Sequence, residues 1–163
     1  MMNVSKEKRT VFTIGSVVCV EVDNQYKCFF QYVARDRSQL NSEVIRVFKR
    51  HYPMDYVPDM DEIVNDDVAF YTHTFIRVGY WEKAWYKVGR HKSIGATDAI
   101  RFKLHGKGWY IWSINGPYIH VELTEEQKKY EYGYVFPYTE VIYKIKHGEY
   151  EFEYCSRRRD IHG

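Results

Sequence analysis

Two stretches near the start of the chain are rich in β-branched and aromatic residues. They cover residues 17–22 and 26–33 and flank the pair Asp23-Asn24. Such runs around a short turn predict a β-hairpin. If Asp23-Asn24 is a two-residue loop, Cys19 lies opposite Cys28 at closely spaced positions, and that register would permit a strained cross-strand disulfide.

The middle of the chain predicts further strands. Residues 40–52 place some apolar side chains at helical spacing, but the run Val-Ile-Arg-Val-Phe within them favours a strand. Residues 69–78 and 83–88 predict a second hairpin around the loop Gly-Tyr-Trp-Glu. In residues 100–105, Ile, Phe and Leu alternate with Arg, Lys and His, so one face of this strand, including Lys103, is expected in water.

Three segments carry helix signals. The residues from Asp59 to Glu62 resemble a capping box and predict a short helical turn. A second capping box at 124–127 predicts a short helix over 125–131. A longer helix is predicted over 137–148, because Pro favours the first turn of a helix and basic residues followed by Gly favour its end.

The segment EYEFEY at 149–154 alternates rings with glutamates. This pattern predicts a last strand with Tyr150, Phe152 and Tyr154 on one face. Together the elements predict a mainly β fold of the β-rich α+β class. Its expected form is a strongly bent antiparallel sheet or a small, partly open barrel, with one or two short helices near the C-terminus.

The composition fits one soluble globular domain. The chain has 163 residues, of which 45% are hydrophobic and 28% are charged, and no linker interrupts it. Residues 1–163 are therefore expected to form a single domain, with a core over about 10–155 and solvated ends at 1–10 and 156–163.

Net charge, hydropathy and cysteine content argue against several classes of protein. The 24 Lys and Arg against 22 Asp and Glu leave a net charge of +2, far from the strongly basic balance of nucleic-acid-binding proteins. Acidic residues follow the apolar stretch 11–20, and no apolar run approaches the ~18 residues of a membrane span, so neither a signal peptide nor a membrane anchor is expected. Three cysteines without a Cys-x-x-Cys pair indicate reduced, structural thiols and a cytoplasmic protein.

No motif for catalysis, phosphate binding or metal binding is present. The seven histidines are scattered, so neither a metal nor a cofactor is expected. His73 lies in an apolar run and is interpreted as a core histidine rather than a ligand or general base; a nucleophilic pair with Cys19 or Cys28 would require the fold to join them. The acidic residues near 59–61 and 66–67 lie beside turns, where carboxylates are usually caps.

Aromatic residues make up 18% of the chain and are dense between residues 108 and 123. There Trp109, Trp112 and Tyr118 could stack on nucleic-acid bases, as surface rings do in OB-folds. Burial of both faces of this strand is the simpler interpretation, because apolar residues point to both sides of it.

A second aromatic cluster consists of Tyr80, Trp81 and Glu82. In the predicted hairpin it would form a loop tip with two large rings exposed to water. Tyr and Trp dominate protein interfaces, so this tip is the candidate surface for a protein partner.

Four segments occur in a distinctive order. They are GSVVCVEVDNQYKCFFQYVA, HTFIRVGYWEKAWYKVG, GWYIWSINGP and GYVFPYTEVIYKIKHGEYEF, within residues 11–154. In this order they resemble a family of bacterial immunity proteins of polymorphic-toxin systems, the immunity family numbered twenty-six, and its relatives in Bacteroidetes-type genomes. The chain departs from that pattern at Gly15-Ser16-Val17, where Gly-Asp-Val is expected.

The resemblance implies a cytosolic, non-enzymatic protein that binds and neutralises a cognate toxin from a neighbouring cell. The alternative hypothesis is an OB-like domain that binds single-stranded nucleic acid through Trp109, Trp112 and Tyr118. A third hypothesis is an enzyme with a site around His73 or a cysteine.

Overall fold

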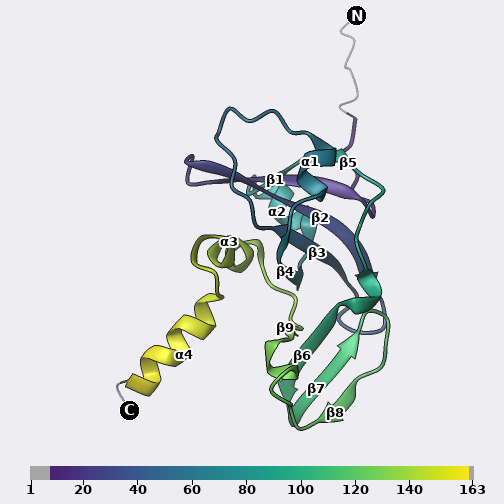
Figure 1. Cartoon of the computed structure of the whole chain (residues 1–163), viewed down its shortest axis with the longest axis vertical. Coiled ribbons are helices and arrows are strands. Elements are labelled where there is room, and N and C mark those ends of the chain that lie inside the picture. Colours follow the sequence, from purple (N-terminus) through teal and green to yellow (C-terminus); the bar gives the residue numbers. More distant parts are fainter. Residues whose placement is uncertain (1–7, 162–163) are drawn as a thin grey trace, which may run out of the picture.

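Two β-sheets form most of the molecule, with helices beside the first of them (Figure 1). The computed structural model describes residues 8–161. Sheet A is antiparallel with the order β4-β3-β2-β1-β5, where β1 is Ser16–Val22, β2 is Tyr26–Asp36, β3 is Ser42–Phe48, β4 is Val68–His73 and β5 is Tyr86–Arg90. Sheet B has the order β8-β7-β6-β9, where β6 is Arg101–Gly106, β7 is Gly108–Ser113, β8 is Ile119–Val121 and β9 is Glu131–Tyr132.

The helices are α1 at Met60–Val64, α2 at Ile76–Trp81, α3 at Tyr138–His147 and α4 at Glu151–Ile161. Short 3-10 turns occupy Thr97–Ala99 and Gln127–Lys129. The fold is therefore mainly β and of the α+β class, with a bent sheet and helices near the C-terminus, as predicted. The strands of the described residues do not close into a barrel.

The central strands of sheet A, β1, β2 and β3, are buried on both faces. Val18 and Ile45 face α2 and α3, whereas Val17 and Phe29 face α1 on the other side. A strand that is buried on both faces has a nearly continuous run of apolar residues in its sequence, and β1 and β2 show this pattern. The same burial confirms the strand predicted within residues 40–52, where β3 is buried at all but one position.

The turn between β1 and β2 contains three residues rather than the predicted two, and two of them adopt positive φ. The extra residue shifts the register by one, so that Cys28 pairs with Val20 and Cys19 pairs with Phe29. A shift of one residue turns a side chain to the other face of a sheet. The predicted pairing of Cys19 with Cys28 is therefore wrong, and all three cysteines are free.

The hairpin predicted around residues 79–82 is also wrong, because helix α2 occupies this segment. Gly79 lets the helix approach Trp85 closely: a Cβ on Gly79 would lie 2.2 Å from the indole ring. The indole N–H of Trp85 donates a hydrogen bond to the carbonyl of Ile76 over 2.8 Å. These tertiary contacts override the β propensity of the local sequence.

Gly79→Ala is expected to lower the free energy of unfolding by about 1–3 kcal/mol, because the new methyl group overlaps the ring of Trp85. Helix propensity alone would raise stability by about 1 kcal/mol for the same change, so the sign separates the two effects. Urea denaturation of both proteins measures the difference. A variant as stable as the wild type would contradict the packing of α2 on Trp85.

Two helices follow one another at the C-terminal end. Helix α3 begins after Pro137 and ends at His147, and Gly148 follows as its C-cap with a φ of 77°, so its predicted bounds are confirmed to within one residue at each end. The strand predicted at 149–154 is wrong, because α4 takes up this segment and extends away from the sheets (Figure 1). The carboxylate of Glu153 caps α4 by accepting a hydrogen bond from the backbone N–H of Tyr150 over 2.8 Å. Acidic residues in the first turn and arginines in the last also favour a helix.

The two shorter helix signals correspond to real caps. Asp59 accepts hydrogen bonds from two backbone N–H groups at the start of α1. Thr124 and Gln127 exchange two hydrogen bonds of 3.0 and 3.2 Å, as a capping box does. The helix that follows is one 3-10 turn, shorter than the predicted span 125–131.

The predicted solvated ends fall partly on residues 1–7 and 162–163, which lie outside the described residues. Within the described part, residues 8–9 and 156–161 are exposed, as predicted. The C-terminal segment 156–161 is nevertheless helical, because it continues α4.

Candidate protein-binding surface

Helix α2 presents a row of apolar side chains to solvent. Phe75, just before the helix, is 48% exposed, Val78 is 41% exposed and Trp81 is 64% exposed. Their spacing of three residues places them on the side opposite Ile76 and Gly79, which are buried against the body of the protein. A row of exposed apolar side chains is a candidate interaction site. We call Phe75, Val78 and Trp81 the α2 surface.

A pocket of about 230 Å³ continues the α2 surface toward α3. Its apolar lining includes Phe75, Val78, Val135, Phe136, Pro137 and Tyr138. A pocket of this size accepts one large side chain, so the α2 surface combines protruding rings with a hollow beside them.

The structure separates the three residues that the sequence predicted here. Trp81 and Glu82 are exposed, but Tyr80 turns toward the N-terminal segment. The Tyr80 ring packs edge-on against Phe12 with 5.5 Å between ring centroids, and its hydroxyl donates to the hydroxyl of Thr10 over 3.1 Å. Sequence reasoning missed the residues at 75 and 78 because it assigned them to a strand, although their spacing to Trp81 is helical.

A cation lies beside the α2 surface. The charged residues of α2 and of the turn after it are Arg77, Glu82 and Lys83. The guanidinium of Arg77 lies 5.9 Å from the centroid of the Trp81 ring and also donates to the carbonyl of Thr10. Arg77 is therefore the cation that lies against Trp81, and it complements an acidic residue of a partner.

The alternative stacking platform is divided between two faces. Trp109 and Trp112 point to opposite sides of β7, and Trp112 is only 1% exposed. Tyr118 is 40% exposed and packs edge-on against Trp112 with 4.9 Å between centroids. The three rings therefore do not form one surface on which successive bases could stack.

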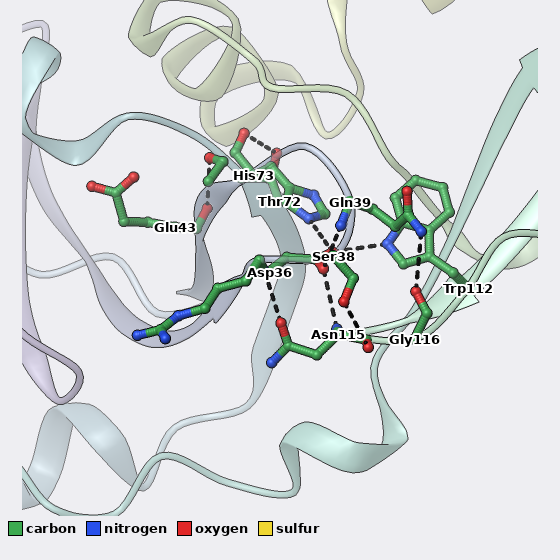
Figure 2. A network of polar contacts seen from close by, with 11 residues as sticks. Asp36, Ser38, Gln39, Glu43, Thr72, His73, Trp112, Asn115 and Gly116 are labelled. Carbon is green, nitrogen blue, oxygen red and sulfur yellow. Dashed lines mark hydrogen bonds and ion pairs between the residues drawn. The ribbon is translucent and has the colours of Figure 1, made fainter.

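Asp36 joins the two sheets through a buried network of hydrogen bonds (Figure 2). Its Oδ2 is bonded to Nε2 of His73 over 2.9 Å and accepts from the indole N–H of Trp112 over 2.8 Å. Its Oδ1 accepts from the backbone N–H of Asn115 over 3.1 Å. The hydroxyl of Ser38 donates to the carbonyl of Asn115, so the loop after β7 is fixed to the turn after β2.

These hydrogen bonds keep Asp36 ionised. Burial raises the pKa of its carboxyl, but the hydrogen bonds from His73, Trp112 and Asn115 outweigh burial and hold the pKa below its ordinary value. Because the carboxylate accepts, Nε2 of His73 donates. Sequence reasoning missed Asp36, since its partners lie far away in the chain.

His73 occupies the position of a core histidine, as predicted. It is completely buried, and the Phe102 ring lies 4.2 Å from the imidazole between centroids. Its Nδ1 is buried without a hydrogen-bond partner in the described part of the chain. An imidazole enclosed in this way cannot exchange a proton with a substrate, so the geometry does not support His73 as a general base.

The buried thiols do not form a nucleophilic pair with His73. The Sγ of Cys28 donates to the carbonyl of Phe48 over 3.5 Å. Burial raises the pKa of Cys28 to about 12 and also raises the pKa of Cys19. Both thiols are therefore protonated at neutral pH, whereas a nucleophile must be a thiolate.

The acidic residues beside turns serve local structure. Asp66 accepts from the backbone N–H of Arg50 over 2.7 Å, and Asp61 pairs with His91 over 2.7 Å. Within residues 8–161, no group of three or more His, Cys, Asp or Glu side chains gathers where it could hold a metal ion. A search of the same residues finds no helix with the length and apolar content that crossing a membrane requires.

Comparisons with protein-family models, with curated proteins and with solved structures give no match to this chain. They neither support nor contradict the resemblance to immunity proteins. The functional conclusion therefore depends on the geometry of the surfaces described above.

Proposed function

We propose that this protein is a non-enzymatic binding protein that neutralises a bacterial toxin by binding it through the α2 surface. The observation that carries the proposal is the exposure of Trp81 in a row with Phe75 and Val78, beside an apolar pocket. Aromatic anchors of this kind contribute most of the binding energy in many protein interfaces. The resemblance to immunity proteins supports a toxin as the partner.

The partner's contact face carries Asp or Glu residues around an apolar side chain. Arg77 beside Trp81 attracts the acidic residues, and the pocket beside Val78 takes the apolar side chain. Complementary charge of this kind accelerates association and fixes the orientation of the complex, and salt weakens its effect.

The partner is to be recovered first. The tagged protein is purified from its host, and the eluate is analysed by mass spectrometry and by ultraviolet absorbance for nucleic acid. A stoichiometric protein with an acidic surface is expected. Recovery of nucleic acid in place of a protein would contradict the proposal and favour the alternative of a single-stranded nucleic-acid binder.

With the purified partner, Trp81→Ala is expected to weaken binding by about 2 kcal/mol or more, which is about 30-fold in Kd. Truncation of Trp81 removes the largest and most exposed side chain of the α2 surface. Ile119→Ala is the matched control, because Ile119 is 53% exposed on β8 in the other sheet. Calorimetric titration measures both variants. Equal Kd values for Trp81→Ala and the wild type would reject the α2 surface as the interface.

A further inference from the structure

Sheet B contains a buried lysine that lacks a carboxylate partner. Lys103 was expected in water, but it is only 7% exposed, so that prediction is wrong. Its ammonium donates to the backbone carbonyl of Lys128 and lies 4.5 Å from the centroid of the Tyr132 ring. Between residues 8 and 161, no carboxylate oxygen lies within 4.0 Å of this ammonium.

A pocket of about 650 Å³ opens beside Lys103. Its lining includes Lys103, Trp109, His120, Glu122, Lys128 and Tyr132. Pockets that bind small molecules have volumes of about 300–1,000 Å³. The half-buried Trp109 lies on the same face of sheet B as Lys103, because Lys103 pairs with Ile111, two residues along β7.

The charge of Lys103 is incompletely balanced. Burial lowers the pKa of Lys103, and the more distant Glu153 and Glu131 only partly oppose this effect, so the pKa lies below its ordinary value. A buried cation without an adjacent anion is costly. The neighbouring Lys128 already has an anion, because it pairs with Glu125 over 2.6 Å. The group that lacks a counter-charge is therefore Lys103.

We propose that this pocket binds a small molecule in which one anionic group is attached to a planar ring. The anionic group accepts hydrogen bonds from the ammonium of Lys103, and the ring stacks on Trp109. Glu122 lines the same pocket and repels a second anionic group, so molecules with a single such group are favoured. Aromatic carboxylates and nucleoside monophosphates share this chemistry. The site is separate from the α2 surface and does not depend on its function.

Calorimetric titration with three probes tests the proposal. Indole-3-acetate carries a carboxylate, adenosine monophosphate carries a phosphate, and indole is the neutral control. At least one anionic probe is expected to bind at one equivalent, and indole is expected to bind at least about tenfold more weakly, because it cannot pair with Lys103. Which anionic probe binds tells whether the natural ligand is a carboxylate or a phosphate. Binding of neither anion at millimolar concentration would overturn the proposal.

Two variants place the binding at this pocket. Lys103→Met keeps the apolar stem and removes the charge, and it is expected to weaken binding of the anionic probe by at least about tenfold. Trp109→Ala keeps the charge, removes the stacking ring and is expected to weaken binding by a similar factor. Val57→Ala is the control, because Val57 is 82% exposed and belongs neither to this pocket nor to the α2 surface, and it should bind the probe like the wild type. Unchanged affinity in a folded Lys103→Met protein would refute the assignment; if that protein does not fold, unchanged affinity in Trp109→Ala does so.

Discussion

Asp36→Ala is expected to lower the free energy of unfolding by about 3–5 kcal/mol. The substitution leaves two buried donors without their acceptor, Nε2 of His73 and the indole N–H of Trp112. It also removes the acceptor of two part-buried backbone N–H groups, those of Asn115 and Gln39. Each buried group without a partner costs about 1–3 kcal/mol. Because domains of this kind have a total stability of about 5–15 kcal/mol, the loss would be apparent in chemical denaturation and in the melting temperature.

Asp36→Asn separates the charge of this residue from its shape. The Asn side-chain amide keeps one oxygen that accepts hydrogen bonds, but its N–H groups face donors that bonded to the second carboxylate oxygen. The expected loss of stability therefore lies between zero and that of Asp36→Ala. The pKa of Asp36 lies below its ordinary value, so the carboxylate stabilises the fold above about pH 4, and this contribution is lost as the pH falls through the lower, folded-state pKa. The wild type should therefore lose stability more steeply than Asp36→Asn below about pH 4. Parallel acid profiles would show that the ionised carboxylate is not what joins the sheets.

Trp85→Ala is expected to destabilise the protein by about 3–5 kcal/mol, because it removes a large buried ring and leaves a cavity. Trp85 is only 2% exposed, and its ring packs edge-on against Phe30 with 4.9 Å between centroids. It also supports α2 through the hydrogen bond to Ile76. Loss of this support should weaken partner binding too, because it displaces the α2 surface. Denaturation and calorimetric titration measure the two effects.

A double-mutant cycle tests whether α2 depends on this ring. Gly79→Ala costs stability in the wild type because its methyl group meets Trp85. In a Trp85→Ala background that ring is absent, so Gly79→Ala should be neutral or slightly stabilising. An equal cost in both backgrounds would assign the effect to the backbone instead. Trp85→Phe is the milder control, since it keeps a ring but loses the hydrogen bond to Ile76.

Elements whose signals lie within the segment itself could be predicted from the sequence. The β1 and β3 strands are rich in β-branched residues, and the side chains on both of their faces are buried. Helix α3 has Pro before its first residue and Gly after its last. In these elements the local propensity and the pattern of buried positions favour the same secondary structure, so either signal predicts it correctly.

Elements decided by distant contacts could not be predicted. The sequence of α2 favours a strand, whereas the helix is supported by contacts with residues outside it, among them Trp85 and Phe12. The alternation before α4 also favours a strand, but no strand of the described residues pairs with that segment. The alternation of apolar and polar residues predicted a solvated face for Lys103. Such a pattern does not show which other segments cover a face of the sheet, and Lys103 is in fact buried. Trp81 was correctly expected at the surface, but it was placed in a hairpin loop and lies in helix α2.

The fold leaves a single accessible thiol. Cys19 and Cys28 are buried, whereas Cys155 on α4 is exposed. A maleimide dye or a biotin group would therefore attach at the C-terminal helix alone, without a cysteine having to be removed from the core. The native chain thus carries its own handle for surface immobilisation or energy-transfer measurements, and labelling leaves both the α2 surface and the pocket beside Lys103 unmodified.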